Sequence, residues 1–167
     1  AFSFLKLKRP LNNKSGIYIW GGVGTGKTML MDKFFKSCTV KNKTRVHFHT
    51  FMQDIHKSLF DLRKKEKHDP IKKIIKMIST KTDLLCFDEL QITDITDAML
   101  VGRLFEGLLN SEVKIVATSN RSPEDLYKDG LNRQLFLPFI KLLKDSLKVH
   151  EMKSGIDYRQ KKLSSEK

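Results

Sequence analysis

Residues 21–28 constrain this chain more than any other stretch. They are Gly-Gly-Val-Gly-Thr-Gly-Lys-Thr, which fits the pattern G-x-x-x-x-G-K-[ST]. The β-branched and aromatic segment 16–20 before them predicts a buried strand. Apolar residues after them repeat at the spacing of a helix with one apolar face, namely Met29, Leu30, Met31, Phe34 and Phe35. A strand, a glycine loop and a helix in this order predict a nucleoside triphosphate site.

The residue types in this loop suit phosphate binding. Glycines let successive backbone N–H groups turn toward an anion, and the N-terminus of the following helix adds partial positive charge. We expect Lys27 to reach the β- and γ-phosphates of ATP and Thr28 to hold Mg²⁺. The predicted nucleotide-binding residues are Gly21, Gly22, Val23, Gly24, Thr25, Gly26, Lys27, Thr28 and Met29.

The net charge of +13 raises the question of a nucleic-acid partner. Residues 41–81 carry 12 basic and 4 acidic side chains, whereas residues 82–140 carry 5 basic and 10 acidic ones. Positive charge therefore gathers away from the predicted chemistry. This distribution favours a solvated, lysine-rich surface over a nucleic-acid groove and leaves an anionic partner open.

The chain has a length that suits one domain. Its 167 residues can bury a sizeable core. No run approaches the roughly 18 apolar residues of a membrane span, so we expect any membrane association to be peripheral. The two cysteines, Cys38 and Cys86, do not form a disulfide framework in the sequence, and we expect reduced thiols.

Strand-like and helix-like segments alternate along the rest of the chain. Further strands are predicted at 45–49, 83–87, 113–118 and 147–150. Helices are predicted from Phe51, Pro70, Asp94 and Arg133, the first ending near Arg63. This order predicts an α/β fold, with a parallel five-stranded sheet covered by helices on both faces.

Two polar pairs in these segments have structural interpretations. His47 and His49 share a face of the predicted strand, but two ligands without a third make a weak metal site. Asp94 and Asp97 are spaced as residues that cap a helix N-terminus. We therefore favour structural roles for all four side chains.

Parallel sheets bind ligands at the carboxyl ends of their strands, where the remaining candidate residues lie. Asp88 and Glu89 follow the apolar strand that ends at Phe87, and Asn120 follows Thr118. Asp88 suits holding Mg²⁺ directly or through water, and Glu89 suits polarising the attacking water. Asn120 is placed to hydrogen-bond the water or the γ-phosphate.

Other classes of phosphate-binding protein fit less well. A small-molecule kinase does not need the adjacent Asp-Glu pair. A GTPase needs Asn-Lys-x-Asp, and residues 42–45 lack its final acid. The basic segments leave a nucleic-acid-remodelling or helicase-loading ATPase as the main alternative. A nucleotide-gated scaffold with little turnover is the third possibility.

Several motifs together resemble the AAA+ superfamily of ring-forming P-loop ATPases: the Asp-Glu pair, the Thr-Ser-Asn strand end and a downstream arginine. A closer resemblance is to the ZapE family, whose mitochondrial relatives include the LACE-type ATPases. It covers nearly the whole chain, through segments 20–32, 46–52, 86–91, 94–99, 118–121, 125–127, 136–140 and 154–159.

The resemblance implies an AAA+ core at 15–150, after an entry segment at 1–14. Residues 151–167 would begin the connection to a C-terminal lid, which we expect to be absent from this chain. The implied activity is Mg²⁺-dependent hydrolysis of ATP to ADP and phosphate by a ring of identical copies that act on protein partners. The implied location is the mitochondrial matrix or inner membrane in a eukaryote, or the cytoplasm and division site in a bacterium.

The resemblance also implies roles for individual polar residues. Asn120 would be the sensor of the γ-phosphate. Arg133 would be the arginine finger that completes a neighbouring copy's site, and Arg121 is the rival for that role.

Overall fold

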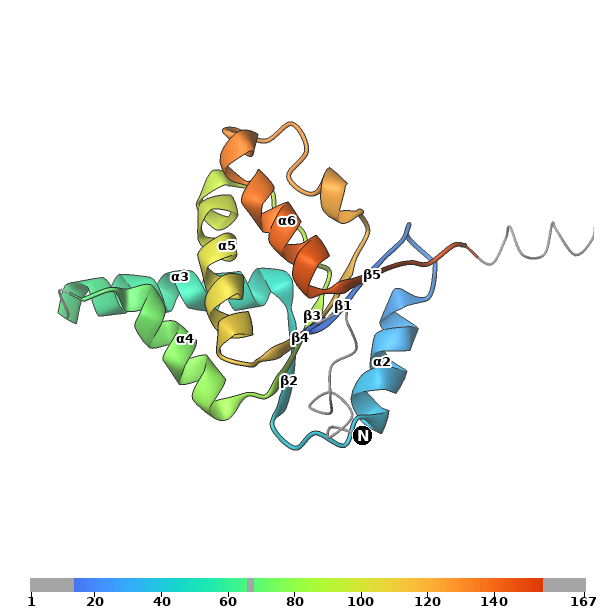
Figure 1. The fold of residues 1–167 in the computed structure, drawn as a ribbon, viewed down its shortest axis with the longest axis horizontal. Helices are drawn as coiled ribbons and strands as arrows, with labels where there is room; N and C mark the ends of the chain where they lie inside the picture. The colour runs from blue at the N-terminus through green and yellow to red at the C-terminus, as the bar shows by residue number, and fades with distance from the viewer. Residues whose placement is uncertain (1–13, 66–67, 155–167) are drawn as a thin grey trace, which may run out of the picture.

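The computed structural model describes residues 14–65 and 68–154 (Figure 1). In chain order the elements are β1 (Gly16–Trp20), α2 (Lys27–Ser37), β2 (Lys43–His47), α3 (Phe48–Lys65), α4 (Pro70–Lys81), β3 (Leu84–Asp88), α5 (Ile95–Asn110), β4 (Lys114–Ser119), η1 (Pro123–Asp125), η2 (Arg133–Leu135), α6 (Leu137–Ser146) and β5 (Lys148–Glu151). No helix in these ranges combines the length and the apolar character needed to cross a bilayer. The predicted entry segment up to residue 13 and the motif at 155–159 lie outside the described residues.

The five predicted strands form one sheet in the order β2-β3-β4-β1-β5, and every neighbouring pair is parallel. The α/β fold predicted from the alternating segments is therefore confirmed. All six residues of β4 are buried, whereas all four of the edge strand β5 are exposed. The ladder aligns Trp20 with Ser119 and Phe87 with Ala117, so the carboxyl ends of β1, β3 and β4 lie at one edge of the sheet.

Helices cover both faces of the sheet, but unequally (Figure 1). On one face α2 packs through Met31 onto a small cluster that includes Leu84, Cys86 and Val116. On the other face α3, α4, α5 and α6 enclose the larger core. Alternation along β3 sends Cys86 to the α2 face, where burial raises the pKa of its thiol to about 12. The thiol therefore stays protonated at neutral pH.

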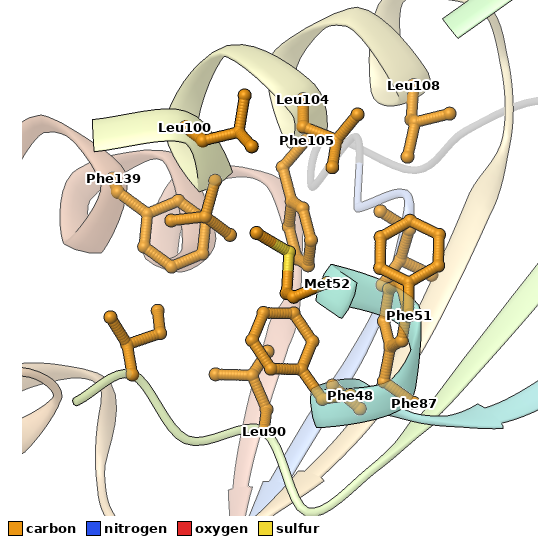
Figure 2. Packing of buried hydrophobic residues seen from close by; sticks show 14 of the residues in the cluster. Phe48, Phe51, Met52, Phe87, Leu90, Leu100, Leu104, Phe105, Leu108 and Phe139 are labelled. Carbon is orange, nitrogen blue, oxygen red and sulfur yellow. The ribbon is translucent and has the colours of Figure 1, made fainter. Parts of the chain in front are cut away.

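Aromatic rings fill the larger core immediately behind the end of β3 (Figure 2). The ring of Phe87 meets Phe48 edge-on at 5.4 Å and Phe51 at 4.7 Å, and it stacks on Phe105 at 5.5 Å. Phe139 of α6 contacts Phe105 at 5.2 Å. Aromatic pairs of this kind stabilise the fold through the apolar area that they bury and through their favourable ring geometry. Phe87 is therefore held rigidly, and so is the start of the segment that follows it.

The predicted strand at 45–49 is wrong at its end, because α3 already begins at Phe48. Phe48 fits an alternating strand, but it is also the first apolar residue of a helical stripe that continues through Phe51 and Ile55. The helical arrangement places its ring against Phe87. His47 and His49 therefore do not share a strand face.

Helix details also differ from the sequence prediction. Met29 and Leu30, assigned to the apolar face of α2, are 63% and 39% exposed. The end predicted near Arg63 for the helix from Phe51 agrees with the structure, in which α3 ends at Lys65. The helix predicted from Arg133 is divided into η2 and α6. The capping prediction is confirmed, because Asp94 caps α5 and accepts a hydrogen bond from the backbone N–H of Asp97 at 2.9 Å.

We predict that Gly16→Ala lowers the free energy of unfolding by about 3 kcal/mol, as overpacking of a rigid site does. An added Cβ would lie 1.7 Å from the backbone oxygen of Ile115 on β4. Gly102→Ala in α5 is the control, since its Cβ would meet only Phe139 at 3.8 Å. Helix propensity should make this control neutral or more stable by up to about 1 kcal/mol. Urea unfolding compares the two, and equal stabilities would contradict the prediction.

Candidate nucleotide-binding site

The predicted phosphate loop connects β1 to the N-terminus of α2. Gly26 caps the helix with φ of 87°, a left-handed conformation that favours glycine. The Nζ of Lys27 lies over the loop and donates to the carbonyl oxygens of Gly21 at 2.7 Å and Gly22 at 2.8 Å. Burial lowers the pKa of Lys27, and the negative charge of Glu89 opposes that change. The ammonium therefore lies at the centre of the loop, within the electrostatic influence of Glu89.

A cavity of about 420 Å³ joins this loop to the ends of β3 and β4. Its lining residues are Val23, Gly24, Thr25, Gly26, Lys27, Thr28, Met29, Glu89, Thr118 and Asn120. Of the other predicted loop residues, Gly21 is buried, and Gly22 lines an adjoining cavity with Arg121. A cavity of about 450 Å³ between α5 and α6 is as large, but the phosphate loop does not contribute to it. The loop cavity is therefore the candidate nucleotide site.

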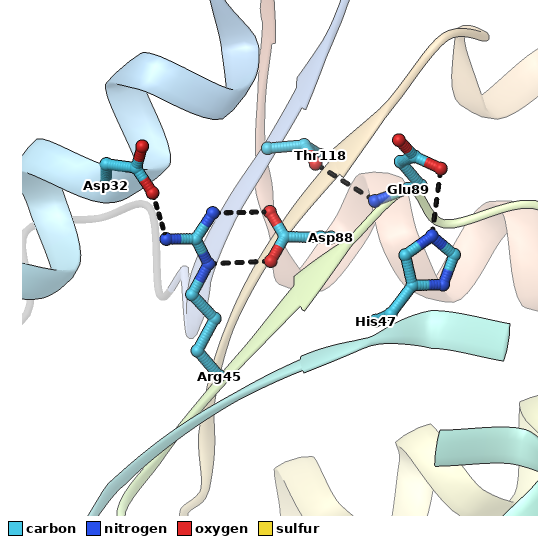
Figure 3. A network of polar contacts seen from close by, with 6 residues as sticks. All are labelled: Asp32, Arg45, His47, Asp88, Glu89 and Thr118. Carbon is cyan, nitrogen blue, oxygen red and sulfur yellow. Dashed lines mark hydrogen bonds and ion pairs between the residues drawn. The ribbon is translucent and has the colours of Figure 1, made fainter. Parts of the chain in front are cut away.

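The end of β4 holds Glu89 in an uncommon backbone conformation. Its φ is 53°, in the left-handed region, and its N–H donates to Oγ1 of Thr118 at 3.1 Å (Figure 3). The next N–H, of Leu90, donates to the carbonyl oxygen of Thr118 at 2.7 Å, and Oγ of Ser119 donates to that of Leu90. Strained residues persist where neighbouring bonds determine the conformation, often at functional sites. Thr118 thus positions Glu89, a role that its place in the sequence did not reveal.

His47 bonds the Glu89 carboxylate across the end of the sheet (Figure 3). Its Nε2 lies 2.9 Å from Oε2 of Glu89, and its Nδ1 accepts the backbone N–H of His49 at 3.3 Å. Because Nδ1 is an acceptor, a neutral ring carries its proton on Nε2 and donates it to Glu89. The two histidines are therefore linked through one backbone bond, and His47 contacts the predicted catalytic acid.

Asp88 is held by an arginine from the neighbouring strand (Figure 3). The guanidinium of Arg45 donates to both carboxylate oxygens, from Nε to Oδ2 at 2.6 Å and from Nη2 to Oδ1 at 3.0 Å. Its Nη1 also donates to Asp32 of α2. These bonds raise the pKa of Arg45, those to Asp88 more than those to Asp32. Sequence reasoning missed Arg45, which lies 43 positions from Asp88 and belongs to no recognised pattern.

The three remaining predicted residues lie in different settings. Asn120 is exposed and lines the same cavity as Lys27. Arg121 is exposed beside the same loop, and its backbone oxygen accepts the buried hydroxyl of Tyr18 at 2.7 Å. Arg133 is half-buried, and its Nη2 donates to backbone oxygens of its own chain at residues 124 and 126. The structure thus brings Asn120 and Arg121 to the site and ties Arg133 to the η1 segment.

We predict that Glu89→Gly gives a more stable protein than Glu89→Ala, by about 1 kcal/mol, because only glycine adopts positive φ without a steric penalty. Both variants remove the carboxylate and its bond to His47, so the difference isolates the backbone strain. Urea unfolding of the two variants is the measurement. An alanine variant that matches or exceeds the glycine variant would show that Glu89 is not strained.

Comparison with known sequences matches this chain to an ATPase family, as the residues of the site suggest. A model of the AFG1-like ATPase family matches residues 3–167. Lactation elevated protein 1 homolog B of Danio rerio is 46% identical over 157 residues, which cover 89% of this chain and 31% of that protein. Cell division protein ZapE of Escherichia coli K12 is 45% identical over 149 residues, which cover 89% of this chain and 39% of that protein. The chain therefore spans well under half the length of these relatives.

Solved structures show the same architecture at lower identity. Domain III of the replication initiation protein DnaA from Thermotoga maritima matches 91% of this chain and 59% of its own, with a TM-score of 0.58 and 22% identity. The DnaC helicase loader matches 91% of this chain and 85% of its own, with a TM-score of 0.61 and 17% identity. These likenesses concern the fold alone, which this chain shares with both proteins.

Proposed function

Because the chain belongs to the AFG1-like ATPase family, we propose that it binds Mg·ATP in the loop cavity and hydrolyses it to ADP and phosphate. Family membership implies ATPase activity. The observation that carries the proposal for this chain is that Lys27, Glu89 and Asn120 line one cavity, from the start of α2 and from the positions just after β3 and β4. A loop that only bound phosphate would not need a carboxylate and an amide in the same cavity.

Each of these groups has a part in moving the γ-phosphoryl group to water. The loop N–H groups and Lys27 neutralise the phosphate oxygens and orient the chain of phosphates. Glu89 accepts a hydrogen bond from the attacking water as it approaches phosphorus, and a carboxylate bonded to His47 retains further acceptor sites. Asn120 donates to the γ-phosphate or the water. As the water oxygen bonds to phosphorus, one of its protons passes to Glu89, the bond from phosphorus to the bridging oxygen breaks, and ADP leaves with that oxygen and the electron pair.

Oxygen ligands at the cavity and beside it suit Mg²⁺. Asp88 does not itself line the cavity, but the next residue, Glu89, does. Thr28 lines the cavity at the start of α2, and Asp88 precedes Glu89 at the end of β3. Hydroxyl and carboxylate oxygens are the ligands that Mg²⁺ takes in phosphate sites, usually with several waters. When bound, the ion would neutralise charge on the β- and γ-phosphates. Thr28 would hold it directly, and Asp88 directly or through water.

We also propose that the protein works as a ring of identical copies on protein clients, as AAA+ ATPases do. An arginine from a neighbouring copy would then contribute charge at the transition state, which is worth roughly 10³–10⁵ in rate in related phosphoryl transfers. Arg133 is the proposed finger. For that role its guanidinium must leave the backbone oxygens of η1, whereas the rival Arg121 is already exposed.

Removal of the Lys27 charge should weaken Mg·ATP binding roughly thirtyfold, since charge-assisted hydrogen bonds contribute about 2 kcal/mol. Isothermal titration of Lys27→Ala with Mg·ATP is the measurement, with Mg·GTP as the comparison ligand. Lys33→Ala is the matched control, because it removes an exposed lysine from the same helix. Unchanged affinity in Lys27→Ala would remove the basis for the site.

Glu89→Gln should retain Mg·ATP and lose turnover, because the amide keeps the shape of the side chain but cannot act as a base. General-base contributions are typically about 10²–10⁴-fold in rate. Phosphate release measured beside ATP affinity separates an ATPase from a scaffold that only binds. A wild-type rate in this variant would exclude Glu89 as the group that activates water.

The same variant tests the arginine across an interface. Glu89→Gln can still present Arg133 to a neighbour, and Arg133→Ala retains its own Glu89. Mixed assemblies should therefore recover turnover that neither variant shows alone. Once subunit exchange has been confirmed, a lack of recovery would exclude Arg133, and the same mixture with Arg121→Ala would test the rival.

A further inference from the structure

The contact between Arg45 and Asp88 is the most specific polar interaction at the end of the sheet. Two nearly parallel bonds join the fork of the guanidinium to both oxygens of the carboxylate, at 2.6 and 3.0 Å (Figure 3). Only 22% of the Arg45 side chain and 19% of the Asp88 side chain are exposed. Paired charges that are this well covered are less screened than a surface pair. The contact therefore fixes the plane of the Asp88 carboxylate.

Strand register explains how Arg45 reaches Asp88. Arg45 on β2 is aligned with Cys86 on β3, and His47 is aligned with Asp88. Side chains two residues apart share a face of a sheet, so Arg45 and Asp88 both lie on the face that α2 covers. The guanidinium extends along that face by one step of the register. A substitution that shortens or bends the side chain would lose this reach.

Asp32 fixes the other side of the same guanidinium. It accepts a hydrogen bond from Nη1 of Arg45, and it lies on α2, the helix that begins with Lys27 and Thr28. Three donors of one rigid fork thus connect the phosphate-loop helix to the end of β3. Lysine cannot make this arrangement, because its ammonium is a single point of charge.

The charge of the cluster remains favourable for a cation. Two carboxylates and one guanidinium carry a net charge of about −1. Each Asp88 oxygen accepts one bond from Arg45 and retains a second acceptor site. Those sites can contact Mg²⁺ or the water molecules that it keeps. The arginine thus orients the carboxylate without using all of its oxygen lone pairs.

We propose that Arg45 is a positioning residue that holds the Asp88 carboxylate in the orientation in which it contacts Mg²⁺ or its bound water. The inference rests on the proposed Mg·ATP site. Partners that orient a metal ligand typically change metal affinity 10–100-fold when they are removed. An ion pair that served only to stabilise the sheet would instead change folding stability and leave the effect of Mg²⁺ on nucleotide affinity intact.

The test measures ATP affinity by calorimetry in Mg²⁺ and again in EDTA, and takes the ratio as the Mg²⁺ effect. Arg45→Met, which keeps much of the length and removes the charge, should lower this ratio about tenfold. Its affinity in EDTA should stay at the wild-type value, because the loop and Lys27 are unchanged. Arg45→Lys should lower the ratio similarly, which separates orientation from charge. If Arg45→Met fails to fold, Arg45→Lys alone provides the test.

Two further variants show whether Arg45 acts through Asp88. In an Asp88→Asn background, Arg45→Met should lower the ratio no further, because the group that it orients is already altered. Asp32→Asn is the matched control, since its amide oxygen can still accept from Nη1. We expect it to retain the wild-type ratio within about threefold, and a loss as large as that of Arg45→Met would contradict the assignment to Asp88.

The remaining outcomes separate this inference from the proposed function. A wild-type chain with equal affinity in Mg²⁺ and EDTA would overturn the proposed metal site and the inference with it. A Mg²⁺-dependent wild type matched by both Arg45 variants would overturn the inference alone. An equal loss of ATP affinity in Mg²⁺ and in EDTA would also overturn the inference, because it would indicate a purely structural role for Arg45. A higher ratio in Arg45→Met would show that the arginine competes with Mg²⁺ for Asp88.

Discussion

Backbone hydrogen bonds on the two sides of β4 are the interactions on which the site depends. They join β4 to β1 on one side and to β3 on the other, and every residue of β4 is buried, so water does not compete for these bonds. The ladder places the ends of three strands at one edge of the sheet. A slip of one residue would reverse which side chains face each layer, and the phosphate loop would no longer meet Glu89. The position of the cavity therefore follows from strand register rather than from any contact within the cavity itself.

Side-chain bonds beyond the ladder set the orientations that the ladder leaves open. Thr118 and Ser119 hold residues 89 and 90 through hydrogen bonds to their backbone. These bonds keep Glu89 in its left-handed conformation. Asp88 is held from β2 by Arg45. Both acids thus take their geometry from a neighbouring strand rather than from β3. Local strain of this kind is maintained by the rest of the fold, which here is the rigid aromatic packing around Phe87.

Much of this could be predicted from local pattern. The loop at 21–28, the order of strands and helices and the acids after Phe87 depend on residues adjacent in the sequence, and local spacing identifies them. The missed features depend on pairs that only the sheet brings together, such as Arg45 with Asp88 and Thr118 with Glu89. The only local sign of the Arg45 contact is an arginine in an alternating strand. That sign does not identify Asp88 as the partner unless the register of β2 against β3 is known. The early start of α3 was missed because Phe48 satisfies two periodicities, and contact with Phe87 decides between them.

The unequal covering of the sheet has a consequence for motion. Within residues 14–65 and 68–154, α2 contacts the sheet through a small cluster of five buried residues, with three partly buried ones packed against it, and through the ion pair of Asp32 with Arg45. The buried five are Met31, Val40, Leu84, Cys86 and Val116, whereas the opposite face carries the much larger main core. Segments with few buried apolar contacts open at a lower free energy than the rest of a protein, which makes α2 the natural unit of local unfolding. Its first turn is also the anion-binding end of the loop. Phosphate binding would therefore suppress the opening of this helix, so that its amide protons would report site occupancy through slower hydrogen exchange.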